Sequence, residues 1–169
     1  MAKPRASIRR LVRIPREYLE ALDLANAVFP SLYQFENGLR LAVHKYLSSL
    51  YTEDWWELSL KARLPAAYEY AAKQQCRMDA MPWIGDSAAV PILPIHLITL
   101  GLLERIVIQY RSECIPSLFP SMDFFLGHME VIKRVRNMYA HMFPCITRGD
   151  CRLARREIAT LAAHINTHL

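Results

Sequence analysis

A repeating apolar stripe restricts the fold of this chain more than any other feature of its sequence. From position 31 to 50, apolar side chains recur mostly every three or four residues: Leu32, Phe35, Leu39, Val43, Tyr46, Leu47 and Leu50. This spacing matches the 3.6-residue turn of an α-helix and creates an apolar face that must be buried against other helices. Similar stripes follow at 95–114 and 122–143. Because only five of the 169 residues are glycine, we predict an all-α fold, an antiparallel bundle of five or six helices.

Prolines and small polar residues predict the first helix boundaries. Pro15 is expected to open a helix, which Pro30 interrupts before a second helix at 31–50. Thr52 is the expected N-cap of a third helix, which runs from 54 to about 73.

The later boundaries follow from the same signals. We expect a break at Pro65, a loop at 76–93 that carries Trp83, and then three helices. These are predicted at 95–114 after Pro94, at 122–143 between Ser121 and Pro144, and at 151–168 with Asp150 as N-cap.

Charge and hydropathy suggest a cytoplasmic protein. Residues 1–14 form a basic segment without the apolar run of a secretory signal, and 15–169 are interpreted as one helical domain. The most apolar stretch, 88–103, is too short and too interrupted by proline to span a membrane. The net charge of +5 permits an anionic partner such as nucleic acid, although an ordinary basic protein has the same balance.

Neither a metal nor another cofactor is expected. The four cysteines, at 76, 114, 145 and 151, form no CxxC pair and are interpreted as free thiols. His164 and His168 have the i, i+4 spacing of a metal-binding pair, but the sequence offers no third ligand beside them.

The stretch "VRNMYAHMFP" carries a group of polar residues on an otherwise apolar helix. Helical geometry places Glu130, Arg134, Asn137 and His141 along one polar seam. Arg136 precedes His141 by five residues and therefore lies about 140° away around the helix. Its long side chain would still reach a ligand over the end of the seam.

These residue types suit metal-independent cleavage of RNA. In that reaction the adjacent 2′-OH attacks the phosphodiester, which requires a proton-transfer group such as His141. It also requires a cation against the developing charge, as Arg136 would provide, and a positioning amide, as in Asn137. The alternative is a histidine that only ends the helix, because the same spacing also arises by chance.

The motif "RNMYAH" resembles the Arg-x4–6-His motif of HEPN domains, in which Asn commonly follows the Arg. "FENGLRLAVHKYL" and the following "DWWE" resemble segments of the Abi-like and Swt1-like branch of that family. "PIHLITLGLLERIV" is similar to a third segment, with Leu102 at a position where the family has Asp. The expected Asp150 N-cap also fits. The resemblance covers about 30–169 in the family's order.

The resemblance implies a helical bundle that forms a homodimer, with the motifs of two subunits facing one composite cleft. Many HEPN domains are metal-independent endoribonucleases of toxin–antitoxin or phage-defence systems. It implies that Arg136 and His141 are catalytic and that Asn137 supports them. An antitoxin or another defence protein would then be a further partner.

Two departures from the family pattern affect regulation and proton transfer. Phe143 stands where some HEPN toxins have a Tyr that a partner enzyme modifies with AMP, so this form of silencing is not expected. Because Pro144 follows, His141 lies in the last helical turn, where the helix dipole favours its protonated form. This suits a general acid better than a base.

Several further residues have both functional and structural interpretations. Arg134 and Glu130 are supporting candidates from the seam, and Glu36 with Arg40 forms an i, i+4 pair that either orients the catalytic residues or joins helices. The arginines of the last helix either follow an RNA backbone or form a solvated surface: Arg148, Arg152, Arg155 and Arg156. Trp55 and Trp56 either stack on bases or belong to the core.

Two functions other than cleavage remain open from the sequence. One is a HEPN module that binds RNA, a nucleotide or a protein without cutting. The other is a helical scaffold whose polar seam is only a dimer interface.

Overall fold

The computed structural model describes residues 14–80, 92–141 and 145–169. Within them the chain is an all-α bundle with no strand, as the apolar periodicity predicts. The α-helices are α1 (Arg16–Tyr51), α2 (Lys61–Arg63), α3 (Pro65–Asp79), α5 (Leu100–Gln109), α6 (Arg111–Ser117), α7 (Met122–Ala140) and α8 (Arg148–Ile165). A π-helical turn, η2 (Trp56–Leu60), and two 3-10 turns, η3 (Pro94–Leu97) and η4 (Asn166–His168), complete the elements.

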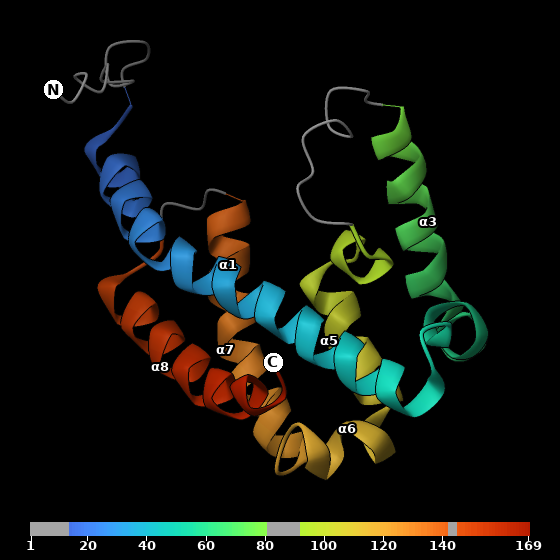
Figure 1. The fold of residues 1–169 in the computed structure, drawn as a ribbon. Coiled ribbons are helices and arrows are strands. Elements are labelled where there is room, and N and C mark those ends of the chain that lie inside the picture. Colours follow the sequence, from blue (N-terminus) through green and yellow to red (C-terminus); the bar gives the residue numbers. More distant parts are fainter. Residues whose placement is uncertain (1–13, 81–91, 142–144) are drawn as a thin grey trace, which may run out of the picture.

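Helix α1 is the long central element, and α8 packs along it, with α7 against α8 (Figure 1). One buried apolar cluster contains residues from Ala21 to Ile165. At its centre lie fully buried side chains from α1 and α7, among them Leu39, Phe125 and Met129. In Figure 1, α3 stands at the opposite end of the bundle from α8, with η3 and α5 between α3 and α7.

The predicted interruption at Pro30 is wrong, because α1 continues through this residue from Arg16 to Tyr51. Proline removes one backbone donor and crowds the preceding turn. The apolar face of α1 is nevertheless buried on both sides of it, at Val28 and Leu32. Tertiary burial of one continuous stripe therefore outweighs the local cost of the proline.

The helix predicted at 54–73 is divided. Thr52 ends α1, and η2 and α2 follow before Leu64 leaves the helical conformation (φ −143°, ψ 67°). This confirms the break at Pro65, since the residue before a proline is pushed out of the α region. Helix α3 extends to Asp79, so the expected loop begins later than residue 76. Trp83 and the rest of 81–91 lie outside the described residues.

The helix predicted at 95–114 is also divided, because Ile98 is extended after η3. Thr99 then caps α5 by accepting a hydrogen bond from the Leu102 N–H at 3.2 Å. Farther along, Ser121 caps α7 as predicted, accepting from the Phe124 N–H at 3.1 Å.

The N-cap predicted for α8 is wrong, since the cap is Thr147 and Asp150 stands three residues inside. The Asp150 N–H donates to Thr147 Oγ1 at 3.1 Å, and the Thr147 N–H donates to Asp150 Oδ2 at 3.1 Å. This reciprocal capping box satisfies two backbone donors, which explains why α8 begins at Arg148. Phe143, Pro144 and the basic segment 1–13 lie outside the described residues.

The tryptophan pair belongs to the core. Trp55 and Trp56 are both buried, and their rings meet edge to face with centroids 5.4 Å apart. Trp55 Nε1 donates to His44 Nδ1 at 3.1 Å. Base stacking on these rings is therefore excluded in this conformation, and the core interpretation is correct.

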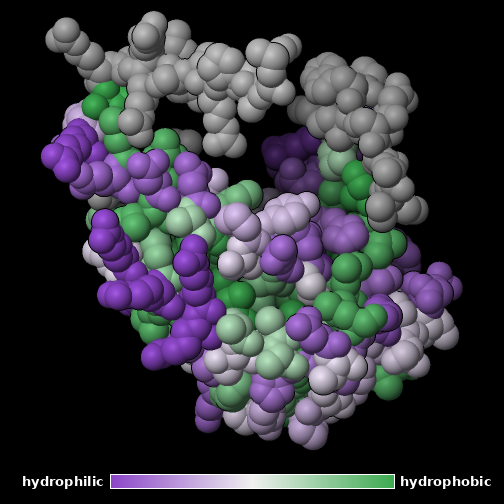
Figure 2. Space-filling view, turned by 60° about the vertical axis from the view of Figure 1, so that its left-hand side comes forward, coloured by the Kyte–Doolittle hydropathy of each residue, from purple (hydrophilic) through white to green (hydrophobic). Residues whose placement is uncertain are grey.

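A row of large apolar side chains is exposed on the N-terminal half of α1: Tyr18, Leu22, Phe29 and Tyr33. Their spacings of four, seven and four residues place them on one side of the helix. On the face seen in Figure 2, hydrophobic side chains are exposed between strongly hydrophilic ones. This row offers apolar area for a partner.

None of the described helices combines the length and apolar character that crossing a membrane requires. The described residues also contain no group of three or more His, Cys, Asp or Glu side chains that could hold a metal ion. His164 instead meets the Phe124 ring, and His168 meets the Tyr46 ring. The four cysteines are free, with Cys114 and Cys151 buried.

Candidate functional site

Helix α7 presents Arg136 and His141 to different surroundings. Arg136 is half-buried and lines two neighbouring hollows, whereas Asn137 and His141 are exposed and line neither of them. The angular separation expected from helical geometry therefore places the arginine on an inner wall and the other two on the outer surface. No carboxylate of a described residue forms an ion pair with Arg136.

His141 stands immediately after the last residue of α7. Its backbone N–H donates to the Asn137 carbonyl at 3.0 Å, and its backbone angles (φ −98°, ψ 6°) leave the helix. Its exposed imidazole is thus held at the helix end, beside the exposed Asn137 amide. A second molecule can reach both groups.

The polar seam is confirmed as an exposed line of side chains on α7: Glu130, Arg134, Asn137 and His141. Arg134 is engaged structurally, since its Nη2 lies 3.6 Å from Asp150 Oδ1 in the first turn of α8. Hydrogen bonds from Thr147 lower the pKa of Asp150, and the charge of Arg134 adds to this effect. Arg134 therefore joins α7 to α8, which weakens its candidacy as a phosphate ligand.

Glu36 and Arg40 form the predicted ion pair, with Arg40 Nη2 2.6 Å from Glu36 Oε1. Arg40 is buried and also donates to two backbone carbonyls, of Ile95 at 3.2 Å and of Ile98 at 2.9 Å. A buried guanidinium requires such complete hydrogen bonding. These bonds attach η3 and Ile98 to α1, which is the structural role that was one of the two interpretations of this pair.

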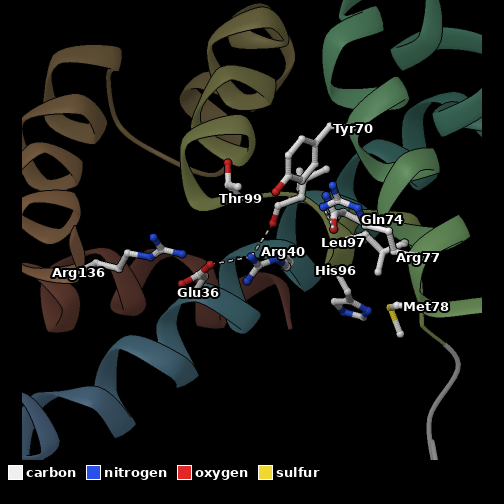
Figure 3. Close-up of a pocket in the computed structure, with 11 residues that line it drawn as sticks. Glu36, Arg40, Tyr70, Gln74, Arg77, Met78, His96, Leu97, Thr99 and Arg136 are labelled. Carbon is white, nitrogen blue, oxygen red and sulfur yellow. Dashed lines mark hydrogen bonds and ion pairs between the residues drawn. The ribbon is translucent and has the colours of Figure 1, made fainter. Parts of the chain in front are cut away.

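The larger hollow has a volume of about 530 Å³ and lies between α1, α3, η3 and α7 (Figure 3). Its polar lining beyond Glu36 and Arg40 comes from three directions: Tyr70, Gln74 and Arg77 on α3, His96 and Thr99 around η3, and Arg136 on α7. In Figure 3, Arg136 extends from α7 toward the Glu36–Arg40 pair.

The smaller hollow, of about 250 Å³, adjoins the first. It shares Glu36, Arg40, His96 and Arg136 with the larger hollow. Its own lining comes from α1 and the end of α7, and three of its six residues are aromatic: Phe29, Leu32, Tyr33, Asn37, Tyr139 and Ala140. The four shared residues therefore lie at the boundary between the larger hollow, which arginines line, and the smaller hollow, which has aromatic side chains.

His96 faces both hollows and was not among the residues predicted from the sequence. Burial lowers its pKa, and the positive charge of Arg40 and the neighbouring His44 lower it further. Its Nδ1 accepts a hydrogen bond from the Leu93 N–H at 3.2 Å. The neutral imidazole therefore carries its proton on Nε2, which remains a hydrogen-bond donor.

Sequence reasoning also missed the contribution of α3. Arg77 lay in the predicted loop, and Tyr70 and Gln74 carried no motif. Only the packing of α3 against η3 brings them near Arg136. The one sequence signal for His96 was its place inside "PIHLITLG", where a polar ring interrupts an apolar segment.

The four arginines of α8 are all exposed, but they do not act as one line of free cations. Arg155 Nη2 donates to the Ala27 carbonyl of α1. Arg156 pairs with Glu157 at 2.7 Å, and Glu157 also contacts His128 of α7. Arg148 and Arg152 form no ion pair with a described residue, so two of the four remain candidates for an RNA backbone.

Comparison of the chain with models of protein families, with curated proteins and with solved structures finds no match. The likeness to HEPN domains therefore rests on the sequence motifs.

Proposed function

We propose that this protein is a metal-independent endoribonuclease of a toxin–antitoxin or phage-defence type. The observation that carries the proposal is the arrangement at the end of α7. Arg136 lines the hollows on the inner side of α7 and has no carboxylate partner among the described residues, and the exposed Asn137 and His141 lie on the outer surface at the end of that helix. A fixed cation, an amide and an imidazole are the groups that phosphodiester cleavage by a neighbouring hydroxyl requires.

In the proposed reaction, the ribose 2′-oxygen attacks the adjacent phosphorus, and the bond to the 5′-oxygen breaks. Arg136 stabilises the negative charge on the phosphorane, and Asn137 positions the substrate or the imidazole. One protonated His141 donates its proton to the leaving 5′-oxygen, while the imidazole of a second copy accepts the proton of the 2′-OH. The products are a 2′,3′-cyclic phosphate and a 5′-hydroxyl.

The second copy is part of the proposal, and an apolar groove beside His141 supports it. This groove, of about 270 Å³, lies between α1 and the last turn of α7 and includes Tyr18, Leu22, Met138 and Ile146. Tyr18 and Leu22 are each nearly half exposed. A homodimer that covers this surface would bring two α7 ends together and form one composite cleft. An antitoxin is the alternative occupant of the same surface.

The deciding experiment is cleavage of a mixed RNA pool in the presence of EDTA. Wild type is compared with Arg136→Ala and His141→Ala, with Arg111→Ala as a control that removes an exposed arginine of α6. We expect cutting by wild type and the control, with cyclic phosphate ends, and a loss of at least a hundredfold in the two site variants. Equal cutting by His141→Ala would contradict the assignment.

A second candidate is a module that holds RNA or a nucleotide without cutting it. The two adjoining hollows favour it, because they form within one chain and need no second copy. This function predicts that RNA is retained by wild type and by His141→Ala alike, with no products. A scaffold would show neither retention nor cleavage.

A further inference from the structure

We infer that the two hollows together hold one nucleotide unit, with its phosphate in the larger hollow and its base in the smaller one. The unit is either part of an RNA chain or a free nucleoside phosphate. Where it belongs to the RNA that is cut, the inference rests on the proposed function and deepens it. Binding of a free nucleotide would stand without that function.

The larger hollow carries an excess of positive charge. Among the described residues, three arginines line it with one carboxylate, that of Glu36, which is already bound by Arg40. Arg77 Nη1 donates to the neutral Gln74 side chain at 3.4 Å and forms no ion pair with a described residue. Arg77 and Arg136 therefore line the hollow as two guanidinium groups without an ion pair to a described residue, and such groups bind phosphate through paired hydrogen bonds.

Two neutral hydrogen-bond donors also line the larger hollow. The Nδ1 of His96 accepts from the Leu93 N–H, and no described residue accepts a hydrogen bond from its Nε2–H, which can therefore donate to a phosphate oxygen. The Thr99 hydroxyl accepts from the Leu102 N–H at the start of α5 and donates its own hydrogen to no described residue. Two cations and two neutral hydrogen-bond donors thus line the larger hollow, as an anion site requires.

The smaller hollow presents aromatic surface suited to a base. The rings of Phe29 and Tyr139 stack with centroids 5.0 Å apart, and Tyr33 lies beside Phe29 at 6.1 Å. Tyr33 is 60% exposed at the rim, so its ring is accessible to a stacking base. Stacking on such rings accepts any base, because every base has a π-face.

We place the sugar of the nucleotide at the residues that line both hollows. Glu36 uses Oε1 for Arg40, and its Oε2 makes no hydrogen bond with a described residue. In Figure 3 the Glu36 carboxylate lies between Arg136 and Arg40, and Glu36 lines both hollows. A ribose placed there would donate a hydroxyl proton to Oε2. The site should therefore prefer ribonucleotides to deoxyribonucleotides.

The test is a binding measurement that does not depend on cleavage. Fluorescence anisotropy of a labelled ten-nucleotide single-stranded RNA is followed on the full chain carrying His141→Ala, so that the probe stays intact. Arg77→Ala and Tyr33→Ala are added singly, with Arg111→Ala and Leu58→Ala as controls at exposed positions away from the hollows. Uridine 5′-monophosphate serves as a competitor, and a DNA of the same sequence is measured in parallel.

We expect each of the two hollow variants to weaken RNA binding at least fivefold, the controls to change it less than twofold, and DNA to bind more weakly than RNA. If uridine 5′-monophosphate displaces the RNA, and this competition is lost in Arg77→Ala, the hollows also bind a free nucleotide. Unchanged affinity in both variants would overturn the inference, and unchanged affinity in Tyr33→Ala alone would overturn the position of the base. If the RNA binds in this manner but wild type does not cut it, the proposed function fails and the inference stands.

Discussion

Arg40 Nη2 lies 2.6 Å from Glu36 Oε1, one turn earlier on α1, and the same guanidinium also holds the carbonyls of Ile95 and Ile98. This one side chain therefore positions η3, and with it His96, against the central helix. The wall between the two hollows depends on it. The pair is thus a structural support of the candidate site.

The first prediction concerns the stability that this support provides. Arg40→Ala should lower the free energy of unfolding by about 3 kcal/mol, because it leaves buried carbonyls and a carboxylate without their donor. Urea unfolding measures the change. Arg16→Ala is the matched control, since Arg16 and Glu20 form an i, i+4 pair of similar length that is mostly exposed and should contribute little. Equal effects of the two variants would contradict the support role.

The second prediction concerns acid stability. Burial alone would raise the pKa of Glu113, but hydrogen bonds from Ser112, Tyr51 and Arg63 outweigh it and lower the pKa to about 2. The folded pKa thus lies below the ordinary value of 4.5. The resulting stabilisation is complete above about pH 4.5 and is lost as the pH falls toward 2.

Glu113→Gln should therefore reduce stability at pH 7 and flatten its decline between pH 5 and pH 2, which denaturant unfolding at several pH values would measure. Glu69→Gln, at an exposed position of α3, is the control. A decline as steep in Glu113→Gln as in wild type would show that other carboxylates cause it.

The third prediction concerns Thr52, the residue at which α1 ends. Its backbone angles (φ 72°, ψ 173°) belong to a region that glycine adopts freely and other residues rarely do. Thr52→Gly should therefore raise the free energy of unfolding by about 1 kcal/mol. Thermal unfolding compares it with Thr52→Ala, which keeps the Cβ and should gain nothing. A glycine variant no more stable than the alanine variant would contradict the strain.

The fourth prediction concerns the second copy. Leu22→Glu places a charge in the apolar groove beside His141 and should shift the protein from dimer to monomer, with loss of RNA cleavage. Light scattering after size exclusion gives the mass of the assembly. Leu58→Glu is the control, since Leu58 is 70% exposed on η2 and lines none of the hollows described. A dimer that survives Leu22→Glu would place the interface elsewhere.

Much of the fold follows from relations between residues close in sequence. Apolar spacing predicts the helices of α1 and α7, because a helical face repeats every turn. Ser121 as a cap and the break before Pro65 follow from local hydrogen bonding and sterics. The continuity of α1 through Pro30 does not, since it depends on burial against α8 rather than on the proline itself.

The candidate site shows the same division. The sequence by itself determines that Arg136 lies on another side of α7 from Asn137 and His141, and that Glu36 and Arg40 pair along α1. Both are consequences of helical geometry within a few residues. Only the tertiary structure brings Arg77, His96 and Tyr33 to Arg136, from helices that are separated along the chain. Arg40 and Ile95 are 55 positions apart, and such contacts arise from packing, on which no local pattern reports.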